Sequence, residues 1–226
     1  MKKTKKFNTK RYVGMAIFSA LAYVIALVCN VIPPVAGFLS LDFKDAVIAM
    51  ASFVYGPIAA VIISFIAAFV ELVTFSTTGW YGFVMNFASS AVFSLAASLV
   101  YRRKKSLNFA LVGFITAVVA TTAVMLCLNI FVTPLYLVQY MGMPASVANE
   151  TVMGLLAKVF LPFNFSKALI NSAVAMMLYK PLTEALRRAK IIEGGKKIAF
   201  NRNTVIILIA GAVALAAALT ILLIIW

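Results

Sequence analysis

The sequence predicts an all-α integral membrane protein, and three observations lead to this class. Hydrophobic residues make up 64% of the 226 residues, and the mean hydropathy is +1.06. Only 12% of the residues are charged, which is about half the share found in soluble domains. The apolar residues are grouped into long runs, and a helix needs roughly 20 such residues to cross a hydrocarbon core about 30 Å thick. We therefore expect a bundle of membrane-spanning helices.

Seven apolar runs follow one another along the chain. The predicted helices are residues 12–32, 46–55, 57–75, 82–101, 107–132, 151–179 and 204–226. The second run is short and is separated from the third by Gly56 and Pro57. Proline is tolerated in the first turn of a helix but not in its interior. We therefore expect the second run to form a separate short helix.

The sixth run contains a proline and a lysine. A single helix over 151–179 would place Lys167 near the bilayer centre, at a cost of about 2.5 to 3.5 kcal/mol. A spanning helix that begins near Pro162 places Asn164 and Lys167 in its two outermost turns instead. We prefer this second arrangement, and we expect the segment before Pro162 to cap the outer surface of the bundle.

Basic residues indicate the orientation of the bundle. The segments 1–11, 102–105 and 180–202 contain 17 of the 20 Lys and Arg residues. With a cytoplasmic N-terminus, all three segments face the cytoplasm, as the positive-inside rule requires. The net charge of +14 is then a topology signal rather than a sign of nucleic-acid binding. The predicted parts are a basic cytoplasmic N-terminus (1–11), a membrane domain (12–190), a charged linker (191–203) and an additional transmembrane helix (204–226).

The residue inventory argues against catalysis. The chain has no His and six acidic residues, and it offers no clear pairing of a nucleophile with a base. The sequence EGGKK at 193–197 is not a phosphate-binding loop, so we expect no ATP hydrolysis by this chain. Cys29 and Cys127 lie inside predicted spans without metal-ligand spacing, and we expect neither a disulfide nor a metal site. An intramembrane enzyme and a structural membrane subunit remain the alternatives of another class.

Polar residues within the predicted spans lie toward the same outer leaflet. Asn86, Asn129 and Asn164 occupy three different spans, and Lys167 follows Asn164 by one turn. An Asn side chain both donates and accepts hydrogen bonds, which suits the edge of a planar ring with alternating carbonyl and N–H groups. We therefore expect a small-molecule pocket that opens outward. Interhelical hydrogen bonds for each Asn, and snorkelling of Lys167 to the headgroups, are the alternatives.

Three further groups of residues accompany this cluster. Asn171 lies on the same helix face as Lys167, and we expect it to serve helix packing. Glu71 is expected to be a helix-end residue at the membrane interface. Aromatic residues at the outer ends of spans stack on a flat ligand or form an interfacial belt; these are Trp80, Tyr81, Phe83 and Tyr136.

These residues also carry a family resemblance. The stretch LDFKDAVIAMASFVYGPIAA at 41–60 resembles the first loop and second helix of the substrate-binding S subunits of energy-coupling factor (ECF) vitamin transporters. The stretches NFASS from Asn86, NIFVTPLY from Asn129 and LPFNFSKALI at 161–170 resemble the riboflavin-specific members. The resemblance covers about residues 10–190.

The resemblance implies a fold, a ligand and partners. The fold is a six-helix S-subunit bundle with a site for riboflavin near the outer face, closed by the first loop as a lid. The partners for high-affinity uptake are a transmembrane coupling subunit and two ATPase subunits, and no cofactor is implied. The alternative is an S subunit for another vitamin, such as thiamine or a pterin. The seventh span is an addition to the family pattern. It either packs on the bundle or on another subunit, or it is a loosely appended anchor.

The resemblance also implies roles for individual residues. The implied substrate-binding residues are Asn164, Lys167, Asn129, Asn86, Leu41, Asp42, Phe43, Thr133, Tyr136, Gly79 and Trp80. Ala16 and Ala20 in the first helix would contact the coupling subunit, because small residues four apart let helices approach closely. Internal packing of the bundle is the alternative explanation for this pair.

Overall fold

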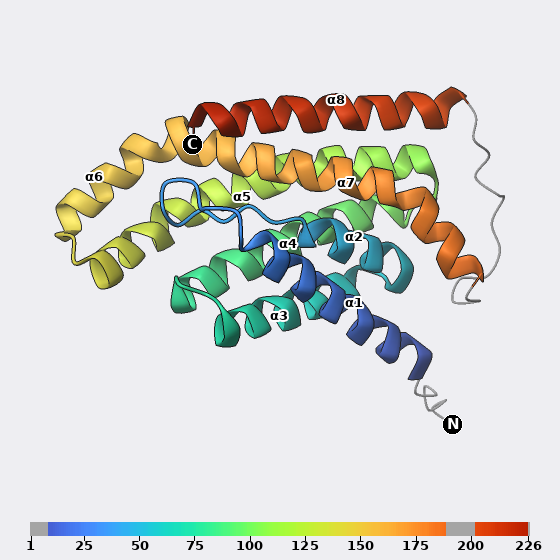
Figure 1. Cartoon of the computed structure of the whole chain (residues 1–226), viewed down its shortest axis with the longest axis horizontal. Coiled ribbons are helices and arrows are strands. Elements are labelled where there is room, and N and C mark those ends of the chain that lie inside the picture. Colours follow the sequence, from blue (N-terminus) through green and yellow to red (C-terminus); the bar gives the residue numbers. More distant parts are fainter. Residues whose placement is uncertain (1–8, 189–201, 226) are drawn as a thin grey trace.

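The chain forms a bundle of helices with no β-strand among the residues that the computed structural model describes, 9–188 and 202–225. The helices are α1 (Thr9–Cys29), α2 (Lys44–Tyr55), α3 (Pro57–Thr74), α4 (Gly79–Tyr101), α5 (Leu107–Met141), α6 (Ala145–Leu155), α7 (Leu161–Arg188) and α8 (Arg202–Ile225), with a π-helical turn, η1 (Leu156–Phe160), between α6 and α7 (Figure 1). The all-α membrane class is therefore confirmed.

Within the part of the chain that the structure describes, five helices are long and apolar enough to cross a membrane. They are α1, α3, α4, α5 and the continuous helix formed by α6, η1 and α7. As predicted, α2 is a separate short helix of 12 residues, and Pro57 opens the helix that follows it. The predicted seventh span corresponds to α8, in which the described apolar stretch is Gly211–Ile225. Large apolar side chains such as Ile17, Val119 and Phe131 point outward, as expected for a surface in contact with lipid.

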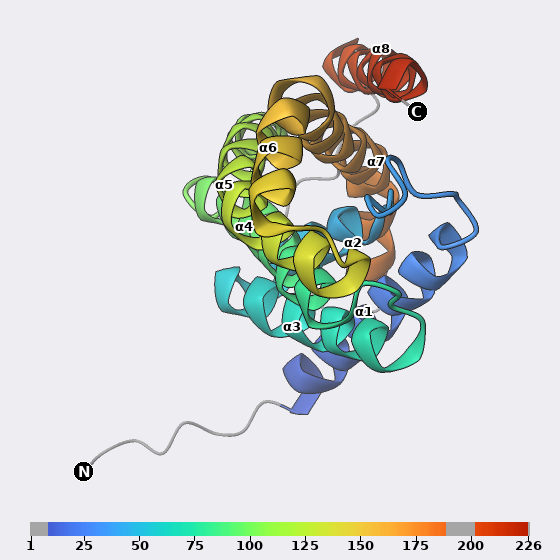
Figure 2. The same cartoon turned by 90° about the vertical axis from the view of Figure 1, so that its left-hand side faces the viewer.

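The fifth helix is longer than its apolar run predicts. It continues past residue 132 to Met141 and contains Pro134 in its interior. The extension is stabilised by packing, because Tyr136 and Leu137 share a buried apolar cluster with Ala148 and Val152 of α6. In Figure 2, α6 lies across the end of the bundle that faces the viewer, so this segment caps that end. That this end is the outer one stays a prediction.

The boundary before α7 is confirmed in position but differs in kind. The helix begins at Leu161, next to Pro162, and α6 leads into it through the π-helical turn without a loop. Pro162 has no N–H to donate to a carbonyl of the preceding turn, and a π-helical turn is one way a helix absorbs such a defect. At its other end α7 extends to Arg188, beyond the predicted residue 179.

The ends of several helices gather at one end of the bundle. The guanidinium of Arg11 donates a hydrogen bond to the Tyr55 carbonyl at 2.7 Å. The ring of Phe53 stacks on Tyr101 at a centroid distance of 4.0 Å, and the hydroxyls of Tyr101 and Tyr179 lie 3.0 Å apart. The start of α1, the end of α4 and the second half of α7 therefore lie together. The three basic segments adjoin these parts, and they can face the same side of the membrane only if the parts lie at one end of the bundle. The side of the membrane that this end faces stays a prediction.

The additional helix α8 packs on the bundle rather than apart from it. Figure 1 shows α8 running along α7, with its C-terminal end near α6 and the first loop, residues 30–43 between α1 and α2. Ala218 and Leu222 of α8 are buried in one apolar cluster with Leu41 of the first loop and Ile170 of α7. The predicted linker 191–203 and N-terminal segment 1–11 lie largely outside the described residues.

Candidate functional site

A cavity lies between the first loop and helices α4, α5 and α7. Its empty volume is about 670 Å³, which includes open space at its mouth. The lining residues are Phe38, Leu39, Ser40, Thr78, Tyr81, Gly82, Met85, Asn86, Ser89, Met125, Asn129, Val132, Thr133, Tyr136, Phe163, Asn164 and Lys167. Polar groups and aromatic rings therefore face the same space.

Six of the predicted site residues lie together in this lining. They are Asn86 of α4, Asn129, Thr133 and Tyr136 of α5, and Asn164 and Lys167 of α7. Helical spacing accounts for the grouping on α5, because residues three, four and seven apart share one face. The predicted convergence of polar residues from three spans agrees with this arrangement.

The other five predicted residues do not line the cavity. Leu41 and Phe43 pack in the apolar cluster with α8, and Asp42 points to lysine side chains. Gly79 begins α4 with φ +56°, and a side chain at this position would collide with the Tyr140 hydroxyl. Trp80 is 64% exposed and packs edge-on against Phe83 rather than over the cavity.

Helical spacing around the asparagines identifies several residues that the sequence analysis missed. Gly82 and Ser89 lie four residues before and three residues after Asn86, and Met125 and Val132 stand at the same offsets from Asn129. Residues at these offsets share a helix face, so the asparagines alone could have indicated them. The lining residues of the first loop have no such periodicity.

The first loop reaches the cavity through a tight turn. Val35 and Leu39 exchange backbone hydrogen bonds, 3.0 Å in each direction. Between them, Gly37 has φ +82°, a conformation that glycine adopts without strain. The turn presents Phe38 to the cavity, where its ring packs at 5.8 Å from that of Tyr136 and 6.1 Å from that of Phe160.

Lys167 joins α7 to the first loop. Its ammonium donates to the Asp42 carboxylate at 2.7 Å and to the Ser40 carbonyl at 3.1 Å. The side chain is buried, so the snorkelling alternative is wrong. Burial favours the neutral acid, but the positive charges of Lys167 and Lys44 outweigh it and lower the pKa of Asp42 to about 2.

A second buried lysine continues the network. Lys44, which precedes the helix predicted at 46–55, is the first residue of α2 and is only 1% exposed. Its ammonium lies 3.3 Å from Asp42 and 2.9 Å from Glu71. Glu71 also accepts a hydrogen bond from the Asn86 amide at 3.1 Å. The prediction that Glu71 lies at the membrane interface is therefore wrong. Its carboxylate is buried inside the bundle, where Lys44 and Asn86 supply the partners that a buried charge needs.

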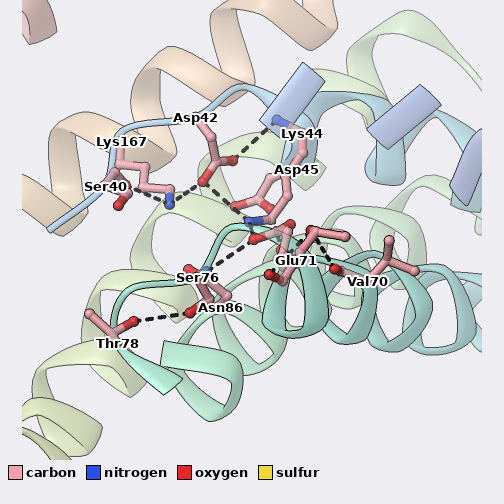
Figure 3. Close-up of polar contacts among 12 residues, drawn as sticks. Ser40, Asp42, Lys44, Asp45, Val70, Glu71, Ser76, Thr78, Asn86 and Lys167 are labelled. Atoms are coloured by element: carbon pink, nitrogen blue, oxygen red, sulfur yellow. Dashed lines mark hydrogen bonds and ion pairs between the residues drawn. The ribbon is translucent and has the colours of Figure 1, made fainter. Parts of the chain in front are cut away.

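These contacts form one continuous chain of polar groups. Figure 3 shows the chain running from Ser40 through Lys167, Asp42 and Lys44 to Glu71 and Asn86. Both of its ends, Asn86 and Lys167, line the cavity. The charged residues between them lie behind the lining, and the whole chain connects the loop to helices α2, α3, α4 and α7.

Asn171 anchors the start of α2. Its side chain accepts a hydrogen bond from the Ala46 N–H at 2.9 Å and donates to the Asp42 carbonyl at 2.9 Å. The first N–H groups of a helix have no partner inside the helix, so an amide from α7 serves as their acceptor. Beside it, the Asp45 carboxylate of α2 accepts a hydrogen bond from the Ser90 hydroxyl of α4. Asn171 is fully buried and is absent from the cavity lining.

Two other features bear on the predicted site. Within residues 9–188 and 202–225, no group of three or more His, Cys, Asp or Glu side chains is placed to hold a metal ion. Ala16 and Ala20 are both exposed on α1. Internal packing of the bundle therefore does not explain this pair, because neither side chain faces another helix core.

Comparison with known proteins identifies the family. The model of the substrate-specific component of ECF transporters matches residues 10–179, most of the chain. The chain belongs to this family. It is therefore a multi-pass membrane component of a transporter and not an enzyme. The predicted six-helix bundle with one helix added agrees with this assignment.

Individual relatives narrow the comparison within the ECF family. The riboflavin transporter RibU of Staphylococcus aureus (strain TCH60) is 31% identical over 80% of this chain and 94% of its own length. The riboflavin transporter FmnP of Bacillus subtilis (strain 168) is 25% identical over 81% of this chain and 99% of its own length. A solved structure described as "Structure and mechanism of the S component of a bacterial ECF transporter" is 30% identical. It superimposes with a TM-score of 0.62 over 78% of this chain and 97% of its own.

Proposed function

We propose that this ECF component binds riboflavin with high affinity and delivers it for uptake into the cell. The observation that carries the proposal is the cavity, in which amide and ammonium groups stand beside aromatic rings. The similarity to the curated riboflavin transporters of Staphylococcus aureus and Bacillus subtilis supports the choice of ligand.

The chemistry of the cavity suits a flavin. An isoalloxazine ring is flat, largely apolar at one end, and carries alternating carbonyl and N–H groups at the other. Tyr81, Tyr136 and Phe38 offer aromatic surface for the apolar part. Asn86, Asn129 and Asn164 offer amide groups for the polar edge and the ribityl hydroxyls. Thr133 and Lys167 add further polar contacts, and the loop that carries Asp42 covers the ligand.

Uptake requires partners that hydrolyse ATP. We propose a transmembrane coupling subunit and two ATPase subunits, with the exposed Ala16 and Ala20 of α1 as part of the contact. Small exposed residues four apart allow a second helix to pack closely. The clustering of helix ends near Arg11 and Tyr101 supports a cytoplasmic N-terminus in a bacterial plasma membrane.

A flavin titration tests the proposal. Protein purified in detergent is titrated with riboflavin while the flavin fluorescence is followed, and thiamine and a pterin serve as competitors. Saturable quenching at one flavin per chain, without displacement by either competitor, is the expected result. Tighter binding of thiamine or of the pterin would instead assign the chain to that vitamin.

A further inference from the structure

Glu71 touches the cavity only through another residue. Its carboxylate oxygen Oε2 accepts hydrogen bonds from the Lys44 ammonium at 2.9 Å and from the Asn86 amide nitrogen at 3.1 Å. Glu71 is 3% exposed and is not among the lining residues. Glu71 belongs to α3, which packs against α4 but contributes no residue to the cavity lining.

This contact decides how the Asn86 amide is oriented. An Asn amide can be turned so that either its oxygen or its nitrogen faces a given direction, and hydrogen-bond partners select the arrangement. Oε2 of Glu71 already accepts a hydrogen bond from the Lys44 ammonium. The group of Asn86 that faces this acceptor is the donating amide nitrogen. The carbonyl oxygen of Asn86 is then left for the cavity, and it has no hydrogen-bond donor within the described part of the chain.

The other two cavity asparagines follow the same rule. The Asn129 amide nitrogen donates to the Met125 carbonyl at 2.7 Å, and the Asn164 amide nitrogen donates to the Phe160 carbonyl at 2.8 Å. Each nitrogen therefore has one of its two N–H groups bonded within the continuous helix that carries it. The Asn129 oxygen accepts from the Thr133 hydroxyl at 2.8 Å, whereas the oxygens of Asn86 and Asn164 have no such donor among the described residues. Asn86 and Asn164 are therefore the amides that present acceptor oxygens to the cavity.

We propose that Glu71 is a specificity-determining positioning residue: by holding the Asn86 nitrogen, it makes Asn86 an obligatory hydrogen-bond acceptor for an N–H or O–H group of the ligand. The inference rests on the proposed flavin binding and adds to it the residue behind the lining that selects the ligand group. Without Glu71, the Asn86 amide turns freely and discriminates less between donors and acceptors.

The test compares ligand discrimination between variants. Affinities are measured for riboflavin, for 3-methylriboflavin, which lacks the ring N–H, and for lumiflavin, which lacks the ribityl hydroxyls. One of these two analogues lacks the donor group that faces Asn86, and the parent is expected to bind riboflavin more tightly than that analogue. In Asn86→Leu the ratio of these two affinities is expected to fall by about tenfold. This factor is the net contribution of one hydrogen bond whose loss leaves no buried group unpaired.

The Glu71 variants separate positioning from structure. Glu71→Leu is expected to reduce the same preference by the same factor, and to add nothing in the Asn86→Leu background, because one residue acts through the other. Glu71→Gln keeps an oxygen for the Asn86 nitrogen and is expected to retain the preference. If Glu71→Leu does not purify, Lys44→Met combined with Glu71→Leu removes both charges together and takes its place. Glu150→Leu, at an exposed position on α6, is the matched control.

The outcomes distinguish the inference from the proposed function. If Glu71→Leu weakens all three flavins equally and keeps the preference, or if its effect is additive with Asn86→Leu, Glu71 is a structural residue and the inference is overturned. If the parent binds none of the three flavins, the proposed riboflavin function fails instead.

Discussion

The Nζ atom of Lys167 lies 2.7 Å from Oδ2 of Asp42 and so ties α7 to the first loop. The same ammonium donates to the Ser40 carbonyl and lines the cavity. An ammonium group has three N–H donors, so one remains for a ligand. Lys167 therefore holds the first loop and, under the proposed function, has a donor left for the flavin.

Replacing Lys167 is expected to weaken flavin binding. Lys167→Met removes the donor from the cavity and leaves Asp42 with Lys44 as its one remaining cation among the described residues. Loss of a polar partner costs about 1 to 3 kcal/mol, or about 5- to 150-fold in affinity. Fluorescence titration of the purified variant with riboflavin measures the change.

The matched control for this variant is Lys158→Met. Lys158 lies in the π-helical turn just before α7, and its side chain is exposed. The control is expected to bind riboflavin as the parent does. Equal affinities for Lys167→Met and the parent would remove Lys167 from the binding site.

The sequence predicts the asparagines of the site, because each is an isolated amide in an apolar span: Asn86, Asn129 and Asn164 all line the cavity. Thr133 also lines it, but the family resemblance alone implied that residue. The role of Glu71 could not be predicted in this way, because its partners Lys44 and Asn86 lie on other helices. A charge near a helix end can face the interface or the bundle, and its spacing along the sequence is the same in both cases.

The fold shows the same division between local and distant contacts. Apolar runs and Pro57 predict the short second helix correctly, because both signals act within a few residues. The extension of α5 to Met141 depends on the packing of Leu137 against α6. Such contacts between separate segments leave no period in the sequence, so an apolar run marks only the part of a helix that meets lipid.

Replacing Asn171 is expected to destabilise the first loop and α2. Asn171→Leu leaves the Ala46 N–H and the Asp42 carbonyl without their side-chain partner. Each buried group left unpaired costs about 1 to 3 kcal/mol. Thermal unfolding of the purified protein in detergent, with and without riboflavin, measures the loss.

The neighbouring residue provides the control for Asn171. The hydroxyl of Ser172 bonds to the Ala168 carbonyl within its own helix, so Ser172→Ala removes no contact between segments. It is expected to unfold within a few degrees of the parent. An unchanged unfolding temperature for Asn171→Leu would show that its bonds to α2 and the loop do not stabilise the protein.

Bulky residues at positions 16 and 20 are expected to separate binding from transport. Both alanines are exposed on α1, so replacing Ala16 and Ala20 by Leu leaves the bundle and the cavity intact while it blocks close approach of a partner helix. Riboflavin affinity should stay at the parent value while uptake by cells that carry the complete transporter falls. Ala217→Leu, exposed on α8, is the control. Equal loss of binding and uptake would mean that the bulky residues disturb the binding site itself and not a contact with a partner subunit.

The last prediction concerns α8 and the lid. Leu222 is 2% exposed and shares an apolar cluster with Leu41 of the first loop, whereas Leu223 beside it is 75% exposed. Leu222→Ala opens a gap behind the loop, and truncating a buried Leu typically costs about 2 to 5 kcal/mol. The contact between Leu222 and Leu41 helps to hold the first loop against the bundle. When this contact is weakened, bound riboflavin is expected to dissociate faster.

A matched pair of variants on α8 tests this link. Dissociation of riboflavin is followed by stopped-flow fluorescence for Leu222→Ala and for Leu223→Ala, which removes the same atoms from the outward face. Faster release from Leu222→Ala alone would mean that α8 stabilises the first loop in its place over the cavity. Identical dissociation rates for both variants and the parent would mean that the lid closes independently of α8, and that the helix serves the protein elsewhere than at its binding site.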